Sequence, residues 1–371
     1  MDYDLNESQT MLKKTARDFL AQECPKSLVK QMAKDDRGYP SELWHKMANL
    51  GWLGLVFPEK YGGSGSNFLD LVVLCEEMGR ACTPAPFFST VILGGMAILE
   101  AGDEPHKKAL IPGIIDGSVL VTLALIEPNG GQFGYDINLE AVANGDGYIV
   151  NGSKIFVPDA HIANYIVCAA RSEKGTTLFL INAGQPGINI TELKTLADDR
   201  QSEVVFNNVN LYKNDVLGAA GKGQDPLRRV LDKAATAKCA EMVGGAQQVL
   251  EMTVDYVKQR VQFGRAVGAF QAVQHHCANM VVYVDTSRML TYKAGWMLSE
   301  GIPCHKEVAM AKAWTSDAYR KVTLLSHQCI GGVGFMEDHD LPLYSKRAKS
   351  AEIAFGDAEF NREVVATEMK L

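Results

Sequence analysis

The sequence lacks long hydrophobic runs, basic clusters and an export signal. Its longest apolar stretches fall well short of the roughly 18 to 20 residues that a membrane-spanning helix needs. Lys and Arg number 37 against 44 Asp and Glu, which gives a net charge of −7 and leaves no basic run for nucleic acid or an anionic membrane. The first four residues include two acidic side chains and precede no apolar segment of the kind that directs secretion, so we expect no export signal. The composition excludes a membrane span and nucleic-acid binding, and we expect a cytoplasmic protein.

Paired cysteines are also missing. The eight cysteines are scattered along the chain, and none belongs to a Cys-x-x-Cys motif. The densest group of metal-ligating residue types lies at 275–277, where a helix would direct three consecutive side chains to different faces. We therefore predict no metal site, and we expect reduced and mostly buried cysteines.

The order of secondary structure predicts three domains within the 371 residues. Apolar residues recur at helical spacing in the first part of the chain, for example at Leu12, Ala16 and Leu20. From about residue 118 the pattern changes to short β segments, and from about 225 it returns to long helices. The boundaries that follow are residues 1–117 for an N-terminal helical domain, 118–215 for a middle β-domain and 216–371 for a C-terminal helical bundle.

The middle segment reads as an antiparallel sandwich or barrel. The sequence Asn-Gly-Asp-Gly at 144–147, between the apolar segments 141–143 and 148–150, is typical of a β-hairpin. Further short strands are predicted at 155–157, 166–169, 178–181, 188–193 and 203–206, a spacing typical of such folds.

Two segments near the C-terminus are more specific. One holds Arg260, Gln262 and Phe263 before a glycine, and the other holds Gln328 before the Gly-Gly-x-Gly of residues 331–334. Taken alone, the first is typical of a helix end with a glycine cap and the second of a turn. Neither is a dinucleotide-binding fingerprint, because each follows a predicted long helix instead of a strand. The two segments become specific only in combination, within a chain whose domains are predicted as helical, β and helical in that order.

With these segments the sequence resembles the acyl-CoA dehydrogenase family over almost its whole length. The resemblance also includes residues 5–9, the segment from Gly51 to Gly63, the Glu127-Pro128 pair and the Gly-Ser-Lys of residues 152–154. It implies a mainly α protein with a central antiparallel β-domain and a C-terminal four-helix bundle. It also implies a tetramer with FAD between the domains.

The resemblance assigns roles to individual residues. Arg260, Gln262 and Phe263 would contact FAD across a subunit interface, and Gln328 with the glycines at 331 and 332 would approach it from the second segment. A guanidinium suits a diphosphate, and glycine suits a backbone packed against a cofactor. The specific glycines are Gly331 and Gly332. The implied reaction is α,β-dehydrogenation of an acyl-CoA thioester, with electrons passed to an electron-transfer flavoprotein.

The sequence departs from the family at the catalytic base. Phe355 stands where the family usually carries a Glu, and the alternative slot holds Ala234 and Ala235. Asp357 could replace the base, or it could cap the following helix. Glu241 lies on nearly the same helical face as Ala234, about 10 Å along the axis, or it could be a buried polar residue bonded to a neighbouring loop.

A third interpretation is that the chain is one subunit of a heteromer whose partner carries the base. A related alternative is a flavin oxidase or monooxygenase of the same family. If the base is unusual, we expect an unusual acyl group, which is cyclic, aromatic or branched.

The β-domain departs as well. Ile126 and Pro158 replace family residues whose hydroxyl groups contact the flavin, so backbone groups would have to make these contacts. Phe156 can still cover a flavin face, or it can belong to the core. The glycine-rich loop at 129–134 differs from the family pattern, which affects the expected contacts to CoA.

Overall fold

The computed structural model describes residues 4–129 and 136–371 and divides the chain into two compact units. The bundle unit comprises Met1–Lys30, Asn67–Thr83 and Ala235–Leu371. The sheet unit comprises Gln31–Ser66 and Pro84–Ala234. One long helix, α7 (Gln224–Gln259), supplies residues to both.

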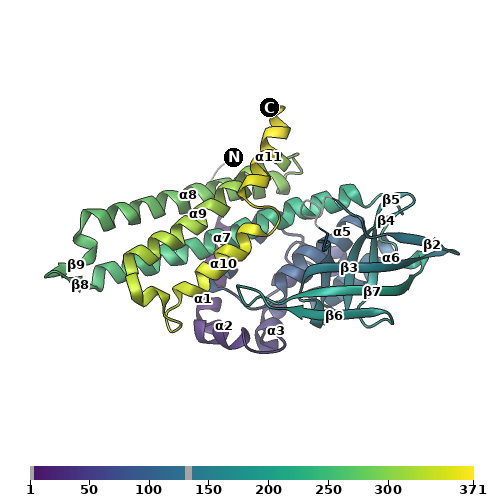
Figure 1. Cartoon of the computed structure of the whole chain (residues 1–371), viewed down its shortest axis with the longest axis horizontal. Helices are drawn as coiled ribbons and strands as arrows, with labels where there is room; N and C mark the ends of the chain where they lie inside the picture. The colour runs from purple at the N-terminus through teal and green to yellow at the C-terminus, as the bar shows by residue number, and fades with distance from the viewer. Residues whose placement is uncertain (1–3, 130–135) are drawn as a thin grey trace. The chain divides into compact units, whose positions relative to one another are not determined.

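Two sheets form the centre of the sheet unit, and Figure 1 shows their strands as neighbouring arrows. The first sheet has the order β1 (Val121–Ala124), β4 (Tyr165–Ser172) and β5 (Gly175–Asn182). The second has the order β2 (Ala141–Asn144), β3 (Gly147–Pro158), β7 (Gln201–Leu211) and β6 (Ile188–Leu193). Side chains of both sheets, including Val150, Phe179 and Phe206, pack into one buried apolar core.

The predicted hairpin is confirmed, because β2 and β3 pair antiparallel with Asn144 opposite Gly147. One pair differs from the predicted antiparallel arrangement, since β1 runs parallel to β4 with Val121 opposite Tyr165. Parallel neighbours need a long connection. The chain between β1 and β4 supplies it by first forming the β2–β3 hairpin of the other sheet.

Shorter helices complete the sheet unit. They are α3 (Ser41–Asn49), the π-helix η3 (Phe88–Gly95), α5 (Met96–Ala101) and α6 (Glu104–Ile115), and α2 (Lys26–Met32) leads into this unit. Gly94 lets η3 approach β1, because a Cβ there would lie 2.6 Å from a methyl carbon of Val121. Trp44 is buried and donates its indole N–H to Gly117 O at 2.9 Å.

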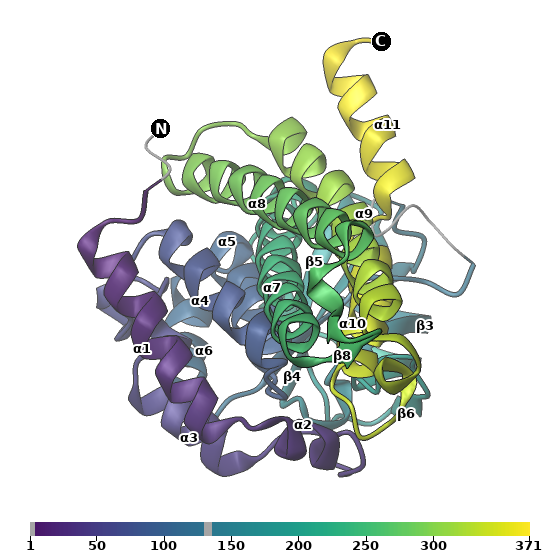
Figure 2. The same cartoon turned by 90° about the vertical axis from the view of Figure 1, so that its left-hand side faces the viewer.

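The bundle unit consists of helices and one small hairpin, and Figure 2 shows several of the helices end-on. Besides the second part of α7, its helices are α1 (Glu7–Glu23), α4 (Phe68–Ala81), α8 (Gln271–Ser299), α9 (His305–Ile330), α10 (Leu341–Ile353) and α11 (Ala358–Met369). The predicted helical C-terminal region is therefore confirmed, and so is the mainly α class with a central β-domain.

A buried carboxylate joins three helices of this unit. Glu76 on α4 is 2% exposed and accepts hydrogen bonds from Lys13 on α1 at 2.9 Å and from Tyr292 on α8 at 2.6 Å. Arg288 on α8 also donates to it at 3.2 Å. Burial raises the pKa of Glu76, but the two cations and the Tyr292 hydrogen bond outweigh this effect and hold the pKa below its ordinary value.

The helices α4 and α7 cross in backbone contact. A Cβ at Gly79 would lie 2.0 Å from Glu241 O, and one at Gly244 would lie 1.8 Å from Glu76 O. Such distances exclude any side chain larger than that of glycine. The crossing therefore fixes where Glu241 lies relative to α4.

Three expectations from composition concern the described residues as a whole. No helix among them is both long and apolar enough to span a membrane. The eight cysteines are free thiols, six of them buried, which confirms the predicted mostly buried thiols. Within residues 4–129 and 136–371, no group of three metal-ligating side chains is positioned to hold an ion.

Candidate functional site

The first C-terminal segment forms a β-hairpin and not the simple capped helix end that it suggests in isolation. After α7 ends, β8 (Val261–Gln262) pairs with β9 (Arg265–Ala266), as Figure 1 shows beyond the ends of α7 and α8. The two turn residues, Phe263 and Gly264, have φ of 53° and 78°. Two successive positive φ values are typical of a type I′ hairpin turn.

The hairpin directs polar and aromatic groups to solvent. Arg260 and Gln262 are exposed, and Phe263 is 92% exposed. The ring of Phe270 supports the turn, with its centroid 6.1 Å from that of Phe263 and 4.1 Å from the Arg265 guanidinium. An ordered but exposed aromatic side chain is typical of a contact surface.

The second segment follows α9 as a short 3-10 helix, η7 (Gly331–Phe335), whose first residues form an open glycine turn. Gly331 has φ of 72°, and a Cβ at either Gly331 or Gly332 would meet no atom of the chain within 4 Å. Packing within the chain therefore does not require glycine at 332, and the space beside both residues is open. Gln328 is exposed, and the ring of Phe335 stacks on His327 at a centroid distance of 4.3 Å.

The two segments lie at the same end of the bundle unit. The hairpin precedes α8 and the glycine turn follows α9, and these two helices pack side by side. The Cys277 thiol near the start of α8 and the Cys329 thiol near the end of α9 lie close enough for each to affect the pKa of the other. The structure therefore brings together two segments that lie about 65 positions apart in the sequence.

Phe355, which stands where the family resemblance expects a base, packs against an apolar cluster. Phe355 has φ of 58° and packs against a buried cluster that contains Ala235 and Cys239 of α7. The other buried members are Ala294, Cys304, Val308 and Ala311. The two positions at which the family resemblance expects a carboxylate, 355 and 234/235, thus meet here, since Ala235 belongs to the cluster and Ala234 is buried beside it in sequence.

Asp357 caps the next helix. Its Oδ1 accepts a hydrogen bond from Phe360 N at 2.9 Å, which confirms the capping interpretation. The loop is further held by Asn361, whose side-chain N–H groups donate to Gly356 O at 3.0 Å and to Asp357 O at 2.9 Å. Asp357 remains next to Phe355 in the same loop, so the capping contact and a role as base stay compatible.

Glu241 lies on α7 and forms an ion pair with Lys238 one turn away. Its side chain is 26% exposed and its ion pair stays within α7, so it is not the buried residue bonded to a neighbouring loop that the sequence suggested as an alternative. The backbone of the same residue is fixed by Gly79 at the crossing of α4 and α7. The structure does not bring Glu241 into the cluster around Phe355.

In the sheet unit, the two β-domain motifs meet in a buried ion pair. Lys154, which is fully buried, donates to Glu127 Oε1 at 2.6 Å and to Leu125 O at 3.0 Å. Glu127 also accepts from the backbone N–H groups of Asn138 and Leu139. Burial raises the pKa of Glu127, but these hydrogen bonds and the Lys154 charge outweigh it and hold the pKa below its ordinary value.

This ion pair holds Ile126 beside β3. Ile126 O accepts from Ile155 N at 2.8 Å, and Pro158 O accepts from Thr122 Oγ1 at 2.5 Å. A register shift between Lys154 and Val157 forms a β-bulge, and Phe156 within it has φ of 53° and is 50% exposed. Bulges of this kind reorient a side chain beside a site. Phe156 therefore belongs to the surface and not to the core.

Three phenylalanines in the candidate site segments share an unusual backbone conformation. Phe156, Phe263 and Phe355 all have φ between 53° and 58°, in the left-handed region that aromatic residues rarely adopt. Such conformations cost about 1 to 3 kcal/mol each and concentrate at functional sites. Each lies in a segment that the sequence marked for function.

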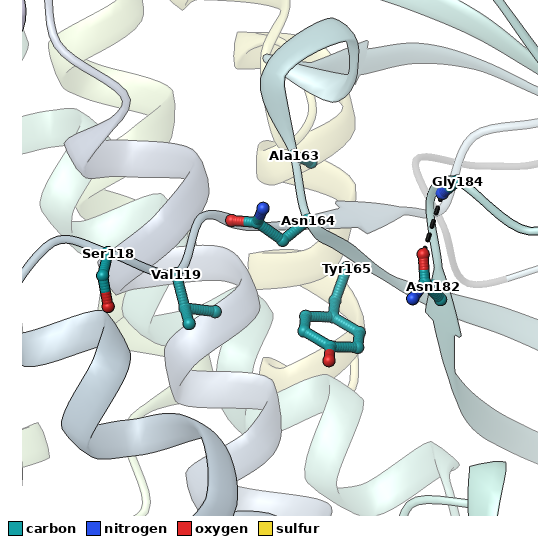
Figure 3. Close-up of a pocket in the computed structure, with 7 residues that line it drawn as sticks. All are labelled: Ser118, Val119, Ala163, Asn164, Tyr165, Asn182 and Gly184. Carbon is teal, nitrogen blue, oxygen red and sulfur yellow. Dashed lines mark hydrogen bonds between the residues drawn. The ribbon is translucent and has the colours of Figure 1, made fainter.

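Two other features do not join the site. The loop residues 130–134 that the sequence associates with CoA lie outside the described residues. The surface hollow in Figure 3, of about 440 Å³, is lined by residues at one end of the first sheet and contains none of the predicted site residues. Its amides are engaged within the chain, because Asn164 accepts from Leu120 N and Asn182 from Gly184 N.

The sequence did not identify Lys154 and Lys312 as organising residues. Both are fully buried lysines. For Lys312 the sequence held one signal. It follows Val308 by four residues and so lies on the buried, apolar face of α9.

Comparison with known proteins decides the family. Models of the N-terminal, middle and C-terminal domains of acyl-CoA dehydrogenases match residues 6–118, 122–209 and 221–370. Acryloyl-CoA reductase (NADH) of Anaerotignum propionicum is 31% identical over 100% of this chain and 96% of its own length. The chain belongs to the acyl-CoA dehydrogenase family. A short-chain-specific acyl-CoA dehydrogenase of Megasphaera elsdenii is also 31% identical, over 97% of each protein.

Solved structures of similar fold extend over the whole chain. The PigA complex with FAD and proline has a TM-score of 0.94 at 25% identity and full coverage of both chains. A chain of the ChsE4–ChsE5 complex from Mycobacterium tuberculosis has a TM-score of 0.93 at 25% identity, covering 100% of this chain and 99% of that chain. An electron transferring flavoprotein structure from Acidaminococcus fermentans has a TM-score of 0.92 at 30% identity, with the same coverage.

These findings confirm the predicted family, its fold class and an FAD-dependent oxidoreductase. The described residues fit the cofactor, because the open space beside Gly331 and Gly332 admits an external group at the backbone. The exposed guanidinium of Arg260 provides fixed donors of the kind that a diphosphate binds.

Proposed function

We propose that this acyl-CoA dehydrogenase family member dehydrogenates an acyl-CoA thioester between its α and β carbons and passes the electrons to an electron-transfer flavoprotein. The observation that carries the proposal is the apolar cluster around Phe355, where the two usual positions of the base meet. An aromatic ring and alanine in place of a carboxylate make this region apolar, which suits an apolar acyl group. We propose a cyclic, aromatic or branched acyl group as substrate.

The chain's own residues would divide the work as follows. Arg260, Gln262 and Phe263 of one subunit would hold FAD, together with Gln328 and the glycine turn after α9. When bound, FAD supplies the acceptor for the electron pair of the β C–H bond. In the sheet unit, Phe156 would cover the flavin, while Ile126 and Pro158 offer only backbone groups, each with a carbonyl that retains a second lone pair.

Asp357 is the base that we propose for the α-proton. It lies two residues after Phe355, in the loop that borders the apolar cluster. The cap hydrogen bond engages Oδ1, and a carboxylate has a second oxygen with which to accept a proton. Glu241 is the alternative, but its ion pair with Lys238 and its distance along α7 favour Asp357.

The decisive experiment is anaerobic bleaching of the flavin absorbance by a panel of acyl-CoA thioesters, with wild type, Asp357→Asn and Glu241→Gln. Asn caps helices about as well as Asp, so Asp357→Asn removes the proposed base but keeps the helix cap. The exposed Glu359→Gln, two residues along, is the matched control. We expect Asp357→Asn to slow flavin reduction at least about a hundredfold, in line with the loss of a general base. If neither substitution slows it, both assignments are wrong.

The same preparation tests the two other functions. A chain that purifies without flavin and gains it only with a partner is a subunit of a heteromer, a role consistent with the similarity to a chain of the ChsE4–ChsE5 complex. Rapid consumption of oxygen by the reduced protein without an electron-transfer partner indicates an oxidase or monooxygenase.

We also propose a homo- or hetero-tetramer. Large apolar side chains lie exposed along α8 and α9, where a soluble monomer would carry polar groups. They are Val281, Val282, Met289, Met310, Trp314 and Leu324. Sedimentation or light scattering of the purified chain measures the assembly, and a monomer would contradict the proposal.

A further inference from the structure

A buried lysine lies beneath the loop that carries Phe355. Lys312 on α9 is 0% exposed. Its Nζ donates to Ser316 Oγ at 2.8 Å, to Glu352 O at 3.0 Å and to Gly356 O at 2.8 Å. All three acceptors are neutral, so the ammonium is solvated by oxygen dipoles and not by a carboxylate. A buried cation without a carboxylate in direct contact is costly, and such an arrangement persists where it organises its surroundings.

Two of the acceptors belong to the segment that leads into the proposed site. Glu352 O lies in the last turn of α10, where carbonyl groups lack helical partners and a cation is favoured. Gly356 O belongs to the residue between Phe355 and Asp357. One cation therefore joins the end of α10 to the loop.

The loop needs such support because its backbone is unusual. Phe355 and Gly356 have successive positive φ values of 58° and 87°. Asn361 donates to Gly356 O from the other side, so this carbonyl receives hydrogen bonds from both Lys312 and Asn361. Lys312 lies on α9 and Asn361 on α11. Together they fix the path of the loop that connects α10 to α11.

We propose that Lys312 is a positioning residue that holds Phe355 against the apolar cluster and presents Asp357 to the substrate. It contacts neither substrate nor cofactor in this role and acts through the carbonyl groups of Glu352 and Gly356. The effect of Lys312 on the reaction rests on the proposed function, whereas the effect of Lys312 on the loop does not depend on that function.

The hydrogen bonds of Lys312 depend on pH. Burial lowers the pKa of Lys312 to about 8, opposed by Cys239 on α7 and by Asp357 and Glu352, while Lys238 on α7 lowers it further. Below that pH the ammonium has three donors for three acceptors. Above it the neutral amine has two. Because burial lowers the pKa, the closed loop accommodates the neutral amine better than the ammonium, relative to an open loop in which Lys312 is hydrated. The loop should therefore open less often as the pH rises above about 8.

The test is hydrogen exchange of peptides covering residues 353–361 in the FAD-loaded protein without substrate, between pH 6.5 and 9.5 and corrected for intrinsic exchange. In wild type we expect protection to rise about tenfold across the transition. In Lys312→Met we expect fast exchange at every pH and no step, with Lys312→Arg restoring part of the protection. Lys306→Met, an exposed lysine of the same helix, is the control and should behave as wild type.

Turnover gives the second measurement. With a substrate found by flavin bleaching, Lys312→Met should lower kcat about tenfold and remove the change of kcat with pH near 8, at unchanged FAD content. A pH-independent protection pattern in wild type overturns the proposal even if Lys312→Met does not fold, and so does a step that persists in the variant. If no thioester bleaches the flavin while the exchange results hold, the proposed function is wrong and the positioning role stands.

Discussion

Replacing Lys154 with Met should destabilise the sheet unit strongly. The substitution keeps the length of the side chain but removes the partner of Glu127 Oε1 at 2.6 Å and of Leu125 O at 3.0 Å. Glu127 is only 9% exposed and would keep its charge with two backbone donors. Removal of one partner of a buried ion pair costs about 3 to 5 kcal/mol. The lost charged hydrogen bond to Glu127 and the unsatisfied carbonyl of Leu125 together give a similar free-energy cost.

The assay is urea unfolding followed by tryptophan fluorescence, because Trp44 and Trp52 are buried in the sheet unit. The matched control is Arg171→Met, which breaks the exposed pair with Glu140 in the same unit and should cost at most about 1 kcal/mol. A loss below about 1 kcal/mol for Lys154→Met at unchanged m-value would refute the reasoning. The double variant Lys154→Met with Glu127→Leu should recover much of the loss, since apolar replacement of both partners is far less costly.

The pH dependence of this pair has a definite sign. The pKa of Glu127 is lowered in the folded protein, so its stabilising contribution is complete above the ordinary carboxyl pKa. The contribution is lost as the pH falls through the folded-state value. Wild type should therefore lose more stability than the double variant on acidification.

Three further substitutions test individual contacts. Asp357→Ala should lower the unfolding free energy by about 1 kcal/mol through loss of the α11 cap, whereas Asp357→Asn should remain near wild type by urea denaturation. Gly356→Ala should cost more than about 1 kcal/mol, because φ is 87° and the new methyl group would lie 2.3 Å from Phe360; equal thermal midpoints would contradict this. Glu76→Gln should cost about 1.5 to 3 kcal/mol at pH 7 and less in acid, where the wild-type carboxylate loses its charge; a pH-independent difference would argue against the ion-pair account.

The sequence predicted the parts of the fold that depend on local pattern. The hairpin at β2 and β3 follows from its Asn-Gly turn, and the long helices from about residue 225 onward follow from helical spacing. The parallel pairing of β1 with β4 was not predictable in this way, because it depends on how a distant hairpin joins the other sheet.

The site shows the same division. The segments around residues 260 and 328 were recognisable from their residue types, and the structure places them at one end of the bundle unit. The hairpin form of the first could not be read from a Phe-Gly pair, which also ends helices. The contact between Lys154 and Glu127 joins residues 27 positions apart, and the anchoring of the loop by Lys312 joins residues 44 apart. Such contacts depend on tertiary packing and leave little trace in a local pattern. The choice between Asp357 and Glu241 stays a prediction.

The left-handed phenylalanines have an evolutionary consequence. At residues 156 and 263, whose rings are 50% and 92% exposed, glycine would adopt the same backbone without strain, so simple selection for stability would favour it. A ring kept at such a position indicates selection for something other than folding. In a library sorted separately for thermal resistance and for turnover, glycine at these two positions should be enriched in the first sort and depleted in the second, and glycine at ordinary core phenylalanines should be depleted in both. The backbone angles alone thus mark where stability and activity compete in this chain.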